Sequence, residues 1–124
     1  MRTLEQELAA QIYAQVSQLQ TDAAHAKEYG GMAHKLPVLI RQAGLVQALA
    51  YVRARGKPGA QRLLADFAQV MGHASPEDLL AAVRNAQLLE YMYLTHRAIV
   101  ALTWYKRFAQ SVLGVEPTDE GGGD

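Results

Sequence analysis

Apolar residues recur every three or four positions along most of this chain, and this spacing constrains the fold more than any other feature. A period near 3.6 residues is typical of a helix with one buried face, whereas a half-buried strand alternates every second residue. Alanine, leucine and glutamine, which favour helices, are abundant, and runs of β-branched residues are scarce. We therefore expect an all-α protein. The first apolar stripe is formed by Leu4, Leu8, Ile12, Val16, Leu19 and Ala23.

Glycines and prolines predict where the first helices begin and end. One long helix should run from about Leu4 to Tyr29, because the pair Gly30-Gly31 is a typical stop signal. A second helical stretch covers residues 32–42, and Pro37 either begins it or kinks it. Gly44 separates this stretch from the next.

The remaining helices carry clearer signals. Ser75 and Pro76 are typical of the N-cap and the first position of a helix. The sequence leaves open whether the helix that follows is broken near Asn85. The expected architecture is a compact single-domain bundle of five to six helices over residues 1–114, followed by a disordered acidic tail. The later helices and the tail should cover residues 45–55, 60–71, 76–113 and 115–124.

The composition excludes several classes of protein. A chain of 124 residues forms one core without needing a metal or a disulfide. The absence of cysteine excludes disulfide frameworks, thiolate zinc sites and cysteine nucleophiles. No apolar run is long enough to span a membrane, and the first residues do not resemble a secretory signal. We therefore expect a cytoplasmic protein without a membrane partner.

The formal net charge of zero conceals an asymmetry along the chain. Residues 1–28 carry a net charge of −2, residues 29–114 carry +6, and residues 115–124 carry −4. A basic middle indicates a polyanionic partner, although solubility alone explains the same pattern equally well.

Four of the cations surround one Gly/Pro turn, and a flexible basic loop of this kind is suited to contacting phosphates. A plain solvated loop is the alternative, because cations near the end of a helix also interact favourably with its dipole. Two further cations bracket an apolar run at residues 36–40. The six residues are Lys35, Arg41, Arg53, Arg55, Lys57 and Arg62.

The last helix is apolar on two sides when it is projected at about 100° per residue. The first side, taken as the core face, holds Leu88, Met92, Thr95, Ile99, Leu102 and Leu113, with Lys106 on the same side near the end of the helix. A helix with two apolar sides is either central in its own domain or shared with another molecule. Aromatic residues and arginine are enriched at protein interfaces, and both also suit contact with RNA. The second side holds Tyr93, Arg97, Val100, Trp104, Arg107 and Phe108.

Catalytic chemistry is not indicated. The four histidines, His25, His34, His73 and His96, do not have a metal-binding spacing, and no catalytic motif with a phosphate-binding loop or a serine nucleophile is present. We expect no enzyme activity, no metal and no cofactor.

Two stretches resemble the small α-helical subunit of the type III-B CRISPR RNA-targeting effector, the Cmr complex. The first contains Tyr29-Gly-Gly31, Lys35-Leu-Pro-Val-Leu-Ile40 and Gly44-Leu-Val-Gln-Ala-Leu-Ala50. The second contains Arg97 and ends in Trp104-Tyr-Lys-Arg-Phe108. The resemblance extends over about residues 4–113, and it is specific only when these fragments are taken together.

The resemblance implies a non-catalytic subunit that acts in antiviral defence. Copies of such subunits stack in a minor filament and help to hold target RNA along the guide. The implied partners are other effector subunits, further copies of this chain, and the backbones of guide and target RNA. A stand-alone helical adaptor without an RNA role is the alternative.

The candidate residues rest on two kinds of argument. The resemblance transfers an RNA-binding role by position to Lys35, Arg41, Arg97, Lys106 and Arg107. Charge alone supports Arg53, Arg55, Lys57 and Arg62 as RNA-binding residues. The expected subunit interface consists of Tyr93, Val100, Trp104 and Phe108.

Overall fold

The computed structural model describes residues 1–118 and shows a bundle of helices without any strand in that range. This confirms the all-α class and the expected number of helices. The elements are α1 (Leu4–Ser17), the short 3₁₀ helix η1 (Gln18–Thr21), α2 (Ala23–Ala43), α3 (Leu45–Arg55), α4 (Pro58–Val70), α5 (Pro76–Asn85) and α6 (Leu88–Ser111). None of the helices in the described range is long and apolar enough to cross a membrane.

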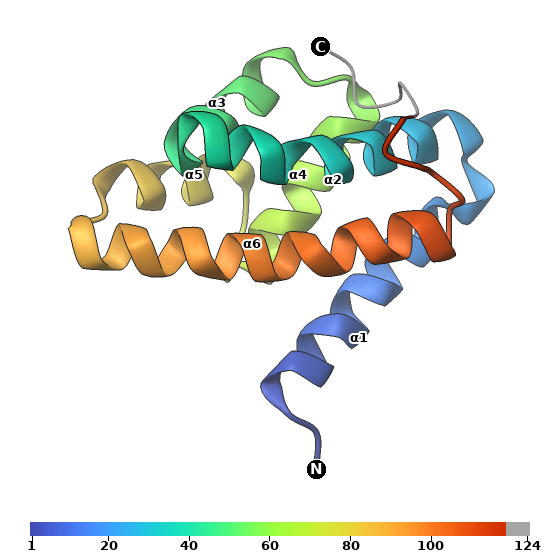
Figure 1. The fold of residues 1–124 in the computed structure, drawn as a ribbon, viewed down its shortest axis with the longest axis horizontal. Helices are drawn as coiled ribbons and strands as arrows, with labels where there is room; N and C mark the ends of the chain where they lie inside the picture. The colour runs from blue at the N-terminus through green and yellow to red at the C-terminus, as the bar shows by residue number, and fades with distance from the viewer. Residues whose placement is uncertain (119–124) are drawn as a thin grey trace.

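The two longest helices, α2 and α6, lie side by side, and α4 packs against α2 (Figure 1). Helices α3 and α5 pack against each other, and α3 also contacts α2 and α4. The second half of α1 packs on α6 and α4 through the buried residues Ile12 and Val16. Its first half extends away from the body of the bundle (Figure 1). The first seven residues are all exposed.

The expected single helix up to Tyr29 is wrong, because the chain turns at η1 and a new helix begins after Asp22. The Asp22 carboxylate accepts a hydrogen bond from the His25 backbone N–H at 3.3 Å, which caps α2. Helix α2 then continues through Gly30-Gly31 and through Pro37. The glycine pair is therefore not a stop signal, and the helix does not begin at Pro37.

Gly30 lies within α2 because the C-terminal segment packs against it. A Cβ atom at Gly30 would lie only 2.7 Å from the Cβ atom of Val115, whose side chain is buried. The Val115 N–H donates to the Ala109 carbonyl at 2.9 Å. The Val115 carbonyl accepts a hydrogen bond from Nε2 of the buried His34, also at 2.9 Å. Val115 thus packs against α2 and is hydrogen-bonded to α2 and α6. Part of the expected tail, residues 119–124, lies outside the described range.

Several local predictions are confirmed. Helix α3 has the expected bounds, and Gly44 before it adopts a φ of 90°, which favours glycine. The Ser75 hydroxyl caps α5 by accepting a hydrogen bond from the Asp78 N–H at 3.2 Å. The sequence left open whether the last helical stretch is broken near Asn85, and the structure shows a break between Asn85 and Leu88.

The predicted core face of α6 is wrong. Leu88 is 72% exposed and Met92 is 58% exposed, so the start of that face lies in solvent. On the helical projection, the observed buried face is rotated by about 90° from the face that the sequence predicted. It is formed largely by alanines, which allow α6 to approach its neighbours closely, and by Tyr105. Because α6 is apolar nearly all round, periodicity alone could not select this face. Its buried residues are Leu94, Ala98, Ala101, Leu102, Tyr105 and Ala109.

Candidate nucleic-acid and protein interfaces

A basic and aromatic cluster lies where α2 and α3 pack together. The Lys35 ammonium of α2 lies 5.5 Å from the centre of the Tyr51 ring of α3. The Arg55 guanidinium, one turn further along α3, lies 6.0 Å from the same ring. We call Lys35, Tyr51 and Arg55 the Tyr51 cluster. Sequence reasoning missed Tyr51. The spacing of four residues between Tyr51 and Arg55 is visible in the sequence, but the approach of Lys35 requires the tertiary fold.

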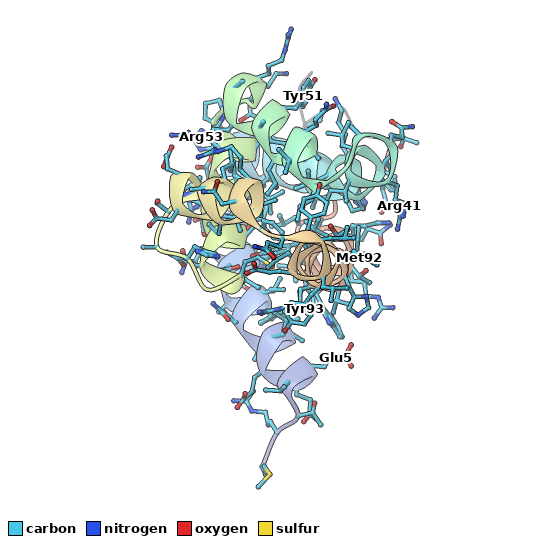
Figure 2. All side chains as sticks on the ribbon, turned by 90° about the vertical axis from the view of Figure 1, so that its left-hand side faces the viewer. Glu5, Arg41, Tyr51, Arg53, Met92 and Tyr93 are labelled. Atoms are coloured by element: carbon cyan, nitrogen blue, oxygen red, sulfur yellow. The ribbon has the colours of Figure 1, made fainter. Side chains whose placement is uncertain are left out.

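Two further predicted cations are exposed near the two ends of α3. Arg41 lies in the last turn of α2, and Lys57 is the residue before α4. Figure 2 shows Arg41, Tyr51 and Arg53 above α6, whereas Tyr93 and Glu5 lie below it. Arg41 and Arg53 thus lie away from Glu5 on the projecting half of α1.

Arg53 forms contacts within the protein. Its Nε donates to the Glu77 carboxylate at 2.6 Å, and its Nη1 donates to the Gln61 side chain at 3.2 Å. The Glu77 carboxyl has a lowered pKa, first because of a hydrogen bond with its own backbone and then because of Arg53. The pair is about half exposed and ties α3 to α5. Arg53 is therefore less available to an external phosphate than Arg41 or Lys57.

Arg62 is also engaged within the protein. Its Nη2 donates to the Gln18 side chain at 3.0 Å. Its charge also helps to lower the pKa of Asp22, after the larger effect of the hydrogen bonds from His25. The structure does not bring Arg53 and Arg62 together with Lys57 as one set of free cations.

The basic turn is short and has hydrogen bonds on both sides. Only Gly56 and Lys57 separate α3 from α4. The Gln61 side chain donates to the carbonyls of Val52, Arg53 and Gly56 at 2.8–3.1 Å, which closes the end of α3. The Glu28 carboxylate of α2 accepts a hydrogen bond from the Gly59 N–H at 2.7 Å.

An aromatic stack joins the second half of α6 to α1. The Trp104 and Phe108 rings are stacked with centres 5.6 Å apart, and Tyr13 of α1 meets Phe108 edge-on at 5.4 Å. The guanidinium of the exposed residue Arg107 lies over Trp104 at 5.1 Å. Trp104 and Phe108 are half-buried, so this predicted interface pair is partly occupied within the protein.

The other predicted residues of α6 differ in exposure. Tyr93 is 59% exposed, whereas Val100, Arg97 and Lys106 are half-buried. Tyr93 is therefore the most accessible of the four expected interface residues.

Most of the large apolar side chains that are exposed belong to α1 or to the first turns of α6. Among residues 1–118 there are eight of them, and only Met1, which precedes α1, and Val38 of α2 lie outside these two helices. Leu4 of α1 is 85% exposed, although the sequence placed it in a buried stripe. We call the seven other than Val38 the α1–α6 apolar surface. They are Met1, Leu4, Tyr13, Leu88, Leu89, Met92 and Tyr93.

The ionisable groups with raised pKa values lie in the interior. The Tyr29 hydroxyl donates to the Asp66 carboxylate at 2.6 Å, and the Tyr105 hydroxyl donates to the Gln15 side chain at 2.6 Å. The Gln15 amide donates to the Asp66 backbone carbonyl at 3.1 Å, which joins the two pairs. Burial raises the pKa of Tyr29, of Tyr105 and of Asp66. This network ties α1, α2, α4 and α6 together.

A surface hollow of about 430 Å³ does not coincide with that network. It lies between the start of α2 and the C-terminal segment, and Lys27 is the one charged side chain among the described residues that line it. Within residues 1–118, no three histidine or acidic side chains are grouped so that they could hold a metal ion.

The comparisons with known proteins all point to one family. A family model described as CRISPR-associated protein (Cas_Cmr5) matches residues 4–112. The protein described as CRISPR system Cmr subunit Cmr5, from Thermus thermophilus, is 45% identical over 113 residues, which cover 91% of this chain and 98% of that protein. The crystal structure of a CRISPR-associated Cmr5 family protein from Thermus thermophilus matches with a TM-score of 0.84 and 43% identity, covering 93% of this chain and 100% of that chain.

Proposed function

Because this chain belongs to the Cmr5 family of CRISPR-associated proteins, we propose that it is a non-catalytic structural subunit of a type III-B Cmr effector. In this role, copies of the chain stack in the minor filament of the complex and help to hold target RNA along the guide. The partners are other Cmr subunits, further copies of this chain, and the backbones of the two RNAs. The name of the Thermus relative, a Cmr subunit, supports the assignment to this complex.

The observation that carries the proposal is a group of exposed cations on α2, α3 and the start of α4, apart from most of the exposed apolar side chains. Other exposed cations, among them Arg2 before α1 and Arg107 on α6, lie outside this group. Most of the exposed apolar side chains lie on α1 and α6, whereas the exposed cations Arg41 and Lys57 and the Tyr51 cluster lie on α2, α3 and the start of α4. Figure 2 shows this separation through Tyr51 above α6 and Tyr93 and Glu5 below it. Exposed apolar patches on small proteins mark protein contacts, and exposed cations suit phosphates.

The RNA contacts in this proposal are weak and independent of sequence. Exposed lysine and arginine side chains bind phosphates and release counterions, so affinity falls as salt concentration rises. Sequence specificity comes from pairing between guide and target, as in other RNA-guided effectors. The protein therefore needs only contacts that do not depend on the identity of the bases.

The interior position of the perturbed groups supports a non-catalytic role. Catalytic groups with shifted pKa values lie in clefts that a substrate can enter. Here Tyr29, Tyr105 and Asp66 are hydrogen-bonded within the bundle and do not line the 430 Å³ hollow. The hydrogen bonds of these groups tie α1, α2, α4 and α6 together, and this structural role accounts for their burial and their raised pKa values.

The proposal is tested with Lys57→Glu and Arg41→Glu in the assembled effector. Both residues are exposed, so helix content by circular dichroism should not change. Loss of one phosphate contact should weaken binding of target RNA severalfold and reduce the slope of log affinity against log salt by about one. Arg2→Glu is the matched control, because it makes the same charge change on the exposed segment before α1.

Each outcome separates the proposal from the adaptor alternative. Weaker RNA binding by both the Arg41 and the Lys57 variants, with the Arg2 variant unaffected, supports the RNA role. Unchanged RNA binding in both variants contradicts it and favours an adaptor that binds one protein partner through the α1–α6 apolar surface.

A further inference from the structure

The Tyr51 cluster has the composition of a site for one unpaired nucleotide. Its ring belongs to α3, one cation comes from α2, and the other comes from the next turn of α3. Both cation centres lie within 6.0 Å of the ring centre. Base, sugar and phosphate of a single nucleotide extend over a comparable span, so one nucleotide can reach the ring and a cation together.

The fold holds the Tyr51 ring in place. Tyr51 is half-buried and packs against the hydrophobic core, so its ring is held by its neighbours while part of it remains accessible. Bases of single-stranded RNA stack on accessible aromatic rings of this kind, and the stacking tolerates any base because every base has a flat face.

The two cations supply the phosphate contacts. The ring attracts the Arg55 guanidinium only weakly at a partly exposed site. When a base takes one face of the ring, its phosphate offers the displaced cation a charged and hydrogen-bonding partner, which is stronger than the ring. The Arg55 guanidinium is also flat and can extend the stack.

Helix geometry explains only part of this arrangement. Arg55 follows Tyr51 by four residues, so the two side chains are neighbours on any helix. Lys35 is 16 positions away from Tyr51 in the sequence and reaches the ring only because α2 packs on α3. The tertiary fold thus adds a second cation to a ring that already had one.

From this geometry we propose that Tyr51 is a stacking platform for an unpaired RNA base whose phosphate is bound by Lys35 and Arg55. The inference rests on the proposed RNA-holding function and gives it a specific site. It assigns to this surface a preference for unpaired RNA over duplex, because a paired base is not free to stack on a side chain.

The test compares Tyr51→Leu with Tyr51→Phe. Leucine keeps an apolar side chain against the core but removes the ring, whereas phenylalanine keeps the ring. The readout is fluorescence anisotropy of the full-length protein with a labelled single-stranded oligouridylate of about 12 nucleotides, a length in the usual range of such sites. An RNA duplex of the same length is measured in parallel.

The proposed stacking site leads to specific expectations for the RNA affinity of each variant. Tyr51→Leu should weaken binding of the single strand about five- to tenfold, with little change in the salt slope and in duplex binding. Tyr51→Phe should bind like the wild type. Lys35→Gln and Arg55→Gln should each lower the salt slope for the single strand by about 0.7.

Failure of the inference is distinguishable from failure of the proposed function. If the wild type binds neither RNA, the RNA role itself fails. If the wild type binds RNA but Tyr51→Leu binds the single strand equally well, the stacking platform is overturned while the RNA role stands. An equal loss in Tyr51→Leu and Tyr51→Phe also overturns the platform, because the ring is then not the group that matters. Circular dichroism and urea unfolding of each variant show whether a loss reflects misfolding.

Discussion

Gly30→Ala should destabilise the protein, although a glycine within a helix is normally improved by alanine. The new Cβ atom would lie 2.7 Å from the Cβ atom of Val115 and 2.9 Å from each of its two methyl carbons. Because all three distances are too short, the C-terminal segment must move away from α2. That movement exposes the buried Val115 side chain and breaks the hydrogen bond from His34 to its carbonyl.

The magnitude follows from three contributions. Exposing a buried valine costs about 1.5–3 kcal/mol. Losing the hydrogen bond costs about 1 kcal/mol. The higher helix propensity of alanine stabilises the folded state by about 1 kcal/mol relative to glycine. We therefore expect Gly30→Ala to lower the free energy of unfolding by about 1.5–3 kcal/mol.

The assay is urea unfolding followed by circular dichroism, with the midpoint as readout and the m-value as a check on two-state behaviour. The control is the same substitution in a Val115→Gly background, where no side chain blocks the new methyl group. In that background Gly30→Ala should raise the free energy of unfolding by up to about 1 kcal/mol. If Gly30→Ala is neutral or stabilising in the otherwise wild-type protein, the packing of Val115 against α2 is refuted.

Two further predictions concern the interior and the start of α2. Asp22→Ala should lower the free energy of unfolding by about 1 kcal/mol in the same urea assay, because it removes the N-cap of α2. Asp22→Ser is the control, because serine can still cap the helix. Equal losses of stability in both variants would contradict the capping role. Burial raises the pKa of Asp66 above its ordinary value of 3.8, so the folded state favours the protonated carboxyl. The stability that this provides is complete below about pH 3.8 and is lost as pH rises through the higher pKa of the folded state. Asp66→Asn should remove this part of the pH dependence when unfolding is measured between about pH 3 and 7, and an identical pH profile in the variant would contradict it.

Local signals in the sequence predicted local structure well. Ser75 and Pro76 define the start of α5, and Gly44 defines the boundary between α2 and α3, because each acts through its own backbone geometry or through a residue three positions away. Gly30-Gly31 and Pro37 have the same local signals, yet α2 passes through all three. At Gly30 the tertiary contact with Val115 explains the glycine, and nothing near it in the sequence indicates that contact.

The functional surfaces were predicted less completely for the same reason. Charge and the resemblance identified Arg41 and Lys57 as candidates, and both are exposed. They could not show that Arg53 is tied to Glu77, since these residues lie 24 positions apart. Charge and the resemblance also could not show that the Lys35 ammonium lies over the Tyr51 ring. Of the α1–α6 apolar surface, the sequence identified only Tyr93 as an interface residue. The rest was missed because α6 has apolar residues in almost every direction, and the alanines of its buried face contribute little to a hydrophobic pattern.

The most direct test of the central claim is a tagged pull-down from the native host at moderate salt, with mass spectrometry of the proteins and sequencing of the RNA in the eluate. The proposed role predicts a multi-subunit complex of Cmr proteins that holds repeat-derived guide RNAs. A paired sample carrying Leu89→Glu and Tyr93→Glu on the α1–α6 apolar surface should recover less of both, because both side chains are exposed and available to a partner. Recovery of the wild-type protein alone, or with one unrelated partner and no RNA, would contradict the claim.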